Sequence, residues 1–99
     1  MNIQNLMKEA QKMQKELLKT QDELGNTEYN GESSIVSVVV NGNKEVKSVK
    51  INIEEDITKD DAEMLEDMVL VALNDAMKKV DKDKEKKMSK YGSAFSGLM

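Results

Sequence analysis

The chain has 99 residues, of which 38% are hydrophobic and only 3% aromatic, enough for one thin aliphatic core. It contains neither Cys nor His, which excludes disulfides, thiolate zinc sites, thiol nucleophiles and the commonest general base. The N-terminal segment is polar and periodic, unlike a signal peptide, and no apolar run approaches membrane-spanning length. We therefore expect a small cytoplasmic protein that is not an enzyme and has no cofactor, metal, membrane or small-molecule substrate.

The net charge of −4 conceals an uneven distribution of charge along the chain. Residues 58–76 contain one Lys and six acidic residues, whereas residues 77–99 contain seven Lys and three acidic residues. Every basic residue is Lys. A negative total argues against nucleic acid as a partner, but the local Lys clusters keep that partner in consideration.

Residues 3–24 are predicted to form an amphipathic helix that ends at Gly25-Asn26, because apolar residues recur at steps of three and four. At 100° per residue, its lysines form a stripe about 60° wide on a face directed away from the core. Such a row of ammonium groups can follow phosphates, although a solvated face with Glu–Lys pairs is the alternative. The stripe consists of Lys8, Lys12, Lys15 and Lys19.

Three short antiparallel strands are predicted between residues 27 and 53, joined as a meander. Asn30-Gly31 and Asn41-Gly42 are the strongest hairpin signals and bracket a middle strand at residues 33–40. A short strand at residues 27–30 precedes it. In the third strand the apolar parity switches near Lys47-Ser48, which predicts a β-bulge.

A second long helix is predicted after Thr58, a fitting N-cap that is followed by Asp60 and Asp61 in the first turn. Its apolar residues are too many for one buried stripe, so a second surface must cover some of them. The thin core and the apolar residues on a second side of this helix together predict a homodimer. The alternative is a helix that is apolar on this side without any partner. The face assigned to the sheet contains Leu65, Val69, Ala72, Ala76 and Val80. The predicted dimer interface beside it contains Met64, Met68 and Val71.

Beyond Val80 the helix becomes rich in lysine and is expected to end at Tyr91-Gly92. Acidic residues between the lysines lower the local potential there. Residues 1–92 are therefore predicted to be one domain, with residues 93–99 as a flexible tail. The second row of candidate DNA-binding residues contains Lys78, Lys79, Lys82 and Lys86.

The absence of Arg and the scarcity of aromatic residues limit the kind of nucleic-acid contact that is possible. Bidentate reading of guanine and stacking on single-stranded bases are both disfavoured, so contacts should go mainly to the phosphates of duplex DNA. The acidic residues 60–67 spread around a helix and do not predict a metal site. Asn74-Asp75 is unusual inside a helix, and packing or interface hydrogen bonding explains it better than an active site, since no base or nucleophile is nearby.

Three stretches together resemble the YbaB/EbfC family of bacterial nucleoid-associated proteins: MKEAQKMQKEL, VVVNGNKEVKSVKINIE and EMLEDMVLVALNDAMKKV. The resemblance covers nearly the whole chain in order and spacing. It implies an α+β fold with the order α-β-β-β-α. It also implies a tweezer-like homodimer whose projecting helices carry the lysine rows, bind double-stranded DNA in the nucleoid, and affect chromosome organisation and gene expression.

The chain departs from the family pattern at two places. Glu32-Ser33-Ser34 replaces a glycine-rich strand entry, and the C-terminal tail lacks the usual glycine- and proline-rich composition. Neither departure affects the lysine rows. A protein from another class, a chaperone-like or interaction adaptor with helical arms, remains the rival interpretation.

Overall fold

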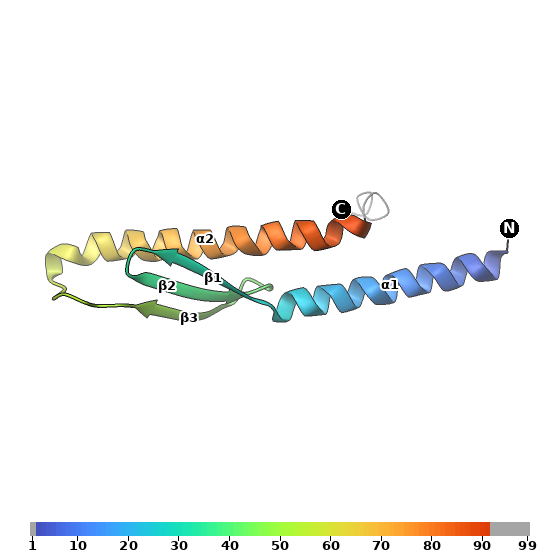
Figure 1. Cartoon of the computed structure of the whole chain (residues 1–99), viewed down its shortest axis with the longest axis horizontal. Helices are drawn as coiled ribbons and strands as arrows, with labels where there is room; N and C mark the ends of the chain where they lie inside the picture. The colour runs from blue at the N-terminus through green and yellow to red at the C-terminus, as the bar shows by residue number, and fades with distance from the viewer. Residues whose placement is uncertain (1, 92–99) are drawn as a thin grey trace.

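A long helix, three strands and a second long helix follow one another along the chain (Figure 1). The computed structural model describes residues 2–91, so the predicted tail at residues 93–99 lies outside the described part. The α-β-β-β-α order predicted for an α+β fold is confirmed. The elements are α1 (Ile3–Asn26), β1 (Glu28–Ser33), β2 (Val36–Asn41), β3 (Val46–Ile51), η1 (Lys59–Asp61), α2 (Ala62–Met88) and η2 (Ser89–Tyr91).

The three strands form an antiparallel sheet in the order β1-β2-β3, which confirms the predicted meander. The first turn, however, is not at Asn30-Gly31. Ser33 pairs with Val36, so the turn is Ser34-Ile35, and Ser34 takes the left-handed conformation there with φ of 50°. The predicted boundaries of the first two strands were therefore wrong by several residues.

Gly31 lies inside β1 because the strand passes very close to α2 at this point. A Cβ atom on Gly31 would lie 2.0 Å from the carbonyl oxygen of Ala72 and 2.6 Å from the amide nitrogen of Ala76. The glycine is needed for close packing between strand and helix, which is the other common use of Gly in a strand.

The second hairpin is where Asn41-Gly42 predicts it. The buried side chain of Asn41 accepts hydrogen bonds from the backbone N–H groups of Asn43 and Glu45, at 2.9 and 3.0 Å. Beyond the turn, Val39 pairs with Ser48 but Val40 pairs with Val46, so Lys47 is the extra residue of a bulge. The predicted β-bulge is confirmed.

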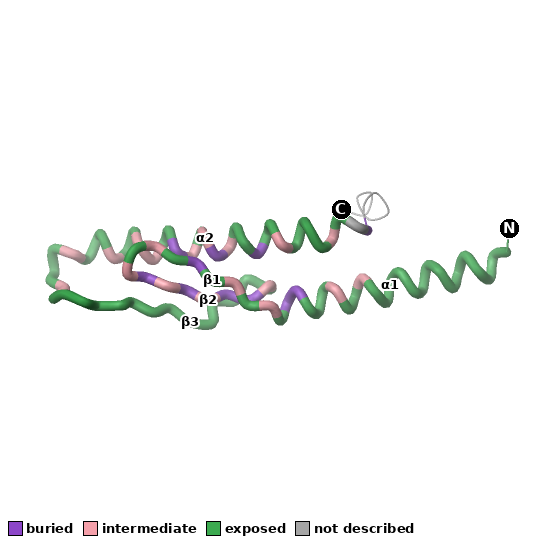
Figure 2. Tube along the Cα trace, in the orientation of Figure 1, coloured by how far each residue is buried: buried purple, intermediate pink, exposed green. Residues whose placement is uncertain are grey.

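The core lies between the sheet and α2, as Figure 2 shows by the buried segments in both. Alternate residues of β2 face the helix, and small residues of α2 allow it to approach closely. A capping box precedes α2: the Thr58 backbone N–H donates to the Asp61 carboxylate at 2.9 Å, which confirms the predicted cap. The buried core residues packed together are Val36, Val38, Val40, Ala72, Ala76 and Val80.

Gly31→Ala should lower the free energy of unfolding by about 2–3 kcal/mol, because the new methyl group forces β1 and α2 apart. Urea denaturation followed by circular dichroism measures this difference. Gly25→Ala is the matched control: its new methyl group meets only the movable side chain of Asn43, at 3.0 Å, and should change stability by less than about 1 kcal/mol. Equal stability of the two variants would contradict the packing role of Gly31.

Candidate nucleic-acid interface

The first helix projects from the body of the molecule like an arm. α1 extends past the sheet toward the same end of the molecule as the C-terminus of α2 (Figure 1). Every residue from 2 to 16 is exposed, while Leu24 and Gly25 at the other end of the helix are buried (Figure 2). Near the body, the hydroxyl groups of Thr20 and Tyr91 are 3.1 Å apart. Among residues 2–91, the arm, residues 3–19, is thus attached to the body at one end only.

All four lysines of the predicted stripe lie on this arm, and all four are exposed. None of them forms an ion pair with another of residues 2–91, so their charges are free to attract an external anion. The lysine stripe, as we call Lys8, Lys12, Lys15 and Lys19, faces away from the apolar side of the helix. The prediction that this stripe does not take part in core packing is confirmed by its exposure.

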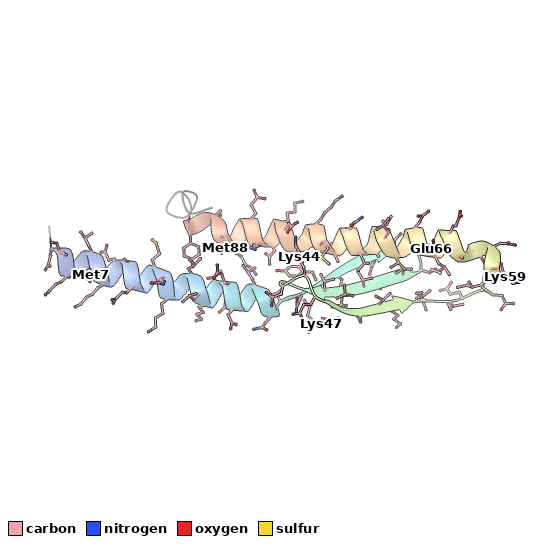
Figure 3. The ribbon with its side chains drawn as sticks, turned by 180° about the vertical axis from the view of Figure 1, so that it is seen from behind. Met7, Lys44, Lys47, Lys59, Glu66 and Met88 are labelled. Atoms are coloured by element: carbon pink, nitrogen blue, oxygen red, sulfur yellow. The ribbon has the colours of Figure 1, made fainter. Side chains whose placement is uncertain are left out.

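The apolar side of the arm is also exposed, because no other part of residues 2–91 covers it. Large side chains at the outer end are open to solvent, and Met7 is labelled there in Figure 3. Hydrophobic periodicity correctly indicates which side of the helix is apolar, but it cannot indicate whether a partner is present. The exposed apolar side chains of the arm include Ile3, Leu6, Met7 and Met13.

The lysines of the last turns of α2 form a second exposed group. Lys79 differs from the others: its ammonium group donates to the carbonyl oxygen of Asn30 at 2.7 Å and lies 3.4 Å from the Asp75 carboxylate. Lys78, Lys82 and Lys86 form no ion pair within the described residues. The structure therefore leaves three lysines of this row unengaged and attaches the fourth to β1.

Two of the three acidic residues between these lysines have partners, whereas Glu85 forms no ion pair within residues 2–91. Asp81 pairs with Lys44 of the second hairpin at 2.8 Å, and Asp83 pairs with Lys87 at 3.0 Å. Lys44 is 37 positions before Asp81, so the sequence pattern alone did not reveal this pair. These pairs reduce the extent to which Asp81 and Asp83 weaken the positive field of the neighbouring lysines.

Hydrogen bonds from β1 fix the orientation of α2. The Tyr29 hydroxyl donates to Asp83 at 2.5 Å, and this bond, followed by that from Lys87, lowers the pKa of Asp83. Burial, and then the Asp83 carboxylate, raises the pKa of Tyr29 to about 12. The backbone N–H of Glu32 donates to Asp75 and, with Lys79, lowers the pKa of Asp75. Asp75 thus bonds to β1 within its own chain, whereas the hydrogen bonding predicted for Asn74-Asp75 is at an interface and stays a prediction.

Tyr29→Phe should lower the free energy of unfolding by about 1 kcal/mol near neutral pH, through loss of the bond to Asp83. The lowered pKa of Asp83 means that this stabilisation is present above the unfolded pKa and is lost as pH falls through the folded one. Because the pKa of Tyr29 is raised, the stabilisation by this hydrogen bond is also lost as pH rises toward 12. Urea denaturation at pH 7 and pH 3 measures the difference between the two proteins, and an equal difference at both would exclude this role for the carboxylate.

A projecting helix whose stripe of lysines forms no ion pair within the described part of the chain is suited to contact a polyanion, and comparison with known proteins agrees. The family model for the YbaB/EbfC DNA-binding family matches residues 1–95. The chain belongs to this family. Its relatives include a nucleoid-associated protein of Ligilactobacillus salivarius, 44% identical over 99% of this chain and 95% of the relative. A nucleoid-associated protein of Lactococcus lactis is 41% identical over 92% of this chain and 93% of the relative.

The fold of this YbaB/EbfC family member is also similar to a solved structure. The crystal structure of an uncharacterised protein from Helicobacter pylori superimposes with a TM-score of 0.68 and 26% identity. The alignment covers 100% of this chain and 99% of the other. The arm is therefore part of the shared architecture.

Two apolar surfaces of the family member are exposed on opposite sides of α2. The predicted dimer interface is on one side, where Met64 and Val71 are exposed and Met68 is half-buried against the core. On the other side, an open hollow is lined by apolar residues of α2 together with Glu66. Those apolar residues are Leu65, Val69, Leu70 and Leu73.

The inner face of β3 carries further exposed apolar residues. Val49 pairs with Val38, and Ile51 pairs with Val36, so they share the face on which the buried valines lie. All six residues of β3 are nevertheless exposed, because α2 packs over β1 and β2. Asp75 contacts β1 at one edge of the sheet. Leu70 lies about 140° around the helix from Asp75, so the side chain of Leu70 is directed toward the other edge, where β3 lies. We call this surface the apolar corner; it contains Val46, Val49, Ile51, Leu65, Val69, Leu70 and Leu73.

The end of the molecule remote from the arm is acidic. Lys59 and Glu66 are labelled near this end in Figure 3, far from Met7 on the arm. Within residues 2–91, no group of three or more acidic side chains is arranged to hold a metal ion. Among the same residues, neither long helix is apolar enough to cross a membrane. The acidic residues 58–76 and the lysines of the arm thus lie toward opposite ends of a molecule that is 72 Å long.

Proposed function

We propose that this protein binds double-stranded DNA as a homodimer through the lysines of its projecting helices, with low sequence specificity. In the cell it would associate with the nucleoid and influence chromosome organisation and gene expression. The observation that supports this proposal most is the lysine stripe, four exposed ammonium groups on one face of the arm that form no ion pair within residues 2–91.

The spacing of the stripe suits a row of phosphates. Consecutive lysines are three or four residues apart, about 4.5–6 Å along the helix axis, so the stripe is about 16 Å long. Phosphates on one strand advance about 3.4 Å per base pair, so a stripe of this length can lie alongside about five of them. Ammonium groups make point contacts that carry little sequence information. Any preference among duplexes would then come from their shape and deformability. Lys78, Lys79, Lys82 and Lys86 would add a second set of contacts, although Lys79 must first leave Asn30.

The acidic end favours one orientation on DNA. Residues 58–76 contain six acidic residues and one Lys, and they lie in the half of the molecule that is remote from the arm. Repulsion between this end and the phosphates would keep it away from the duplex and direct the arm toward it.

We propose that a second copy of the chain covers the apolar corner. A small protein rarely exposes a contiguous apolar surface of this kind unless it is an interface. In the corner, the apolar residues of β3 are exposed on the face that they share with the buried valines, and Leu70 of α2 is 57% exposed. A dimer would also double the number of lysines that reach one duplex, which raises the affinity.

An adaptor that binds polypeptide is the second candidate function, and one observation favours it. Ile3, Leu6 and Met7 are exposed at the outer end of the arm, where they could contact apolar segments of another protein. The lysine stripe on the opposite face has no role in that function.

Fluorescence anisotropy with a labelled mixed-sequence duplex at low salt distinguishes the two functions. DNA binding should be saturable and should be reversed by unlabelled duplex of unrelated sequence, while an unfolded model polypeptide should not compete. The adaptor function would be supported instead if the polypeptide bound and the duplex did not.

A further inference from the structure

The outer end of the arm combines exposed apolar side chains with positive charge. Ile3 and Met7 are 71% and 58% exposed, and Leu6 between them is exposed as well. The first turn of α1 contains no acidic residue, and the first charged side chain of the helix is that of Lys8. The positive end of the helix dipole lies at the same place, so the charge there is positive at short range. We call residues 3–8 the arm tip.

The opposite end of the molecule contains an apolar hollow that no part of residues 2–91 fills. It has a volume of about 320 Å³ and lies between the Ser34-Ile35 turn, residues 53–57 and the beginning of α2. Ile53 in its lining is 61% exposed and Met64 is 46% exposed, so the apolar surface is open to solvent. The apolar residues that line the hollow are Ile35, Ile53, Ile57, Met64 and Met68.

Carboxylates line the same hollow, and most of them are uncompensated. Glu54, Glu55 and Asp56 are exposed and form no ion pair within the described part of the chain. The fourth carboxylate, that of Asp61, accepts a hydrogen bond from the Thr58 backbone N–H in the cap that precedes α2. An apolar lining with uncompensated negative charge fits an apolar segment that is positively charged. We call this site the acidic hollow.

The arm tip matches the acidic hollow in both properties, but it must come from another copy of the chain. Met7 on the arm and Lys59 beside the hollow are labelled at opposite ends of Figure 3, in a molecule that is 72 Å long. Phosphates are excluded from the hollow by repulsion from its carboxylates. Leu6 lies about 180° around α1 from Lys15, so an arm whose apolar side is in a hollow still presents the centre of its lysine stripe to solvent.

We propose that copies of this protein associate head to tail, with the arm tip of one copy in the acidic hollow of the next. The two surfaces differ, so the contact is heterologous and repeats into a ring or an open chain. The hollow is on the Met64 side of α2 and the apolar corner is on the other side, so the same assembly accommodates both contacts. On a duplex, this contact would make neighbouring copies bind cooperatively. The association itself requires no DNA.

Cysteine cross-linking tests the proposal in the full chain, which has no native Cys. On mild oxidation, Met7→Cys/Met64→Cys should give disulfide-linked products of three or more chains, because each link leaves one cysteine free at either end. The matched control Lys12→Cys/Met64→Cys, whose first cysteine is on the opposite face of the arm, should give at least tenfold less. Mass spectrometry should find position 7 joined to position 64. Equal yields, products of two chains only, or links between identical positions would overturn the proposal.

Sedimentation provides a second test that needs no cross-link. At low salt and high micromolar concentration, the unaltered protein should exceed the mass that it has at low micromolar concentration. Glu55→Lys/Asp56→Lys should raise the dissociation constant of this further association at least fivefold. Glu63→Lys/Asp67→Lys, the charge-matched control on exposed residues outside the hollow, should change it less than twofold. A constant mass of the unaltered protein, or equal effects of the two variants, would overturn the proposal. Both tests are performed without DNA, so their failure is distinguishable from failure of the proposed function.

Discussion

Lys12→Glu/Lys15→Glu should abolish measurable binding of duplex DNA while the helix content and dimer mass remain those of the unaltered protein. The two lysines are at the centre of the lysine stripe, and a dimer loses four such contacts. Each phosphate contact contributes roughly tenfold to affinity at 0.1 M salt, so the loss should be on the order of 10³-fold or more. The fold should be unaffected, because exposed substitutions of this kind change stability by less than about 0.5 kcal/mol. Anisotropy titrations and circular dichroism measure the two quantities.

Lys47→Glu/Lys59→Glu is the charge-matched control for this experiment. Both residues are exposed and lie outside the arm, and the change in net charge is the same. This control should retain most of the affinity. Lys82→Glu/Lys86→Glu should have an intermediate effect. If the arm variant binds like the unaltered protein, the lysine stripe is only a solvated helix face and the contact must be elsewhere.

Leu70→Glu should disrupt the dimer, whereas Val71→Glu should leave it intact. The two residues are neighbours with similar exposure in the single chain, 57% and 53%, but they lie on different sides of α2. A carboxylate at position 70 would be buried without a partner in the apolar corner of each dimer, at a cost of several kcal/mol. The dissociation constant of the dimer should therefore rise at least 100-fold.

Sedimentation at low micromolar concentration measures this effect against the chain mass of 11.1 kDa. The unaltered protein and Val71→Glu should have about twice that mass, and Leu70→Glu should be monomeric or lose its cooperative thermal transition. If Val71→Glu were monomeric and Leu70→Glu dimeric, the dimer interface would be at Met64, Met68 and Val71, as the sequence predicts. A dimer in both variants would exclude each of these surfaces.

The two helices and the second hairpin were predictable because each depends on local signals. Thr58 with Asp61 marks the beginning of the second helical region, and Asn41-Gly42 marks a turn whose neighbours pair directly. Asn30-Gly31 gave the same local signal but has a different role. Its glycine is required by Ala72 and Ala76, which are more than 40 positions away and cannot be recognised from the dipeptide itself.

The lysine stripe was predictable for the same reason, since four lysines on one helix face follow from helix geometry alone. The partners of Lys79 and Asp81 were not, because Asn30 and Lys44 belong to the sheet and come close only after folding. The apolar corner was missed as well. Apolar and polar residues alternate in β3, which suggests a strand with one buried face. In a single chain α2 is too narrow to cover that face, so it stays exposed.

The salt dependence of DNA binding by the unaltered protein tests the proposed electrostatic mechanism most directly. If a dimer contacts about four to eight phosphates through lysine, the logarithm of the association constant should fall linearly with the logarithm of the salt concentration. The slope should lie between roughly −4 and −7, since each contact contributes about −0.9. Binding that is nearly independent of salt would contradict recognition of phosphates by the lysines of the arm.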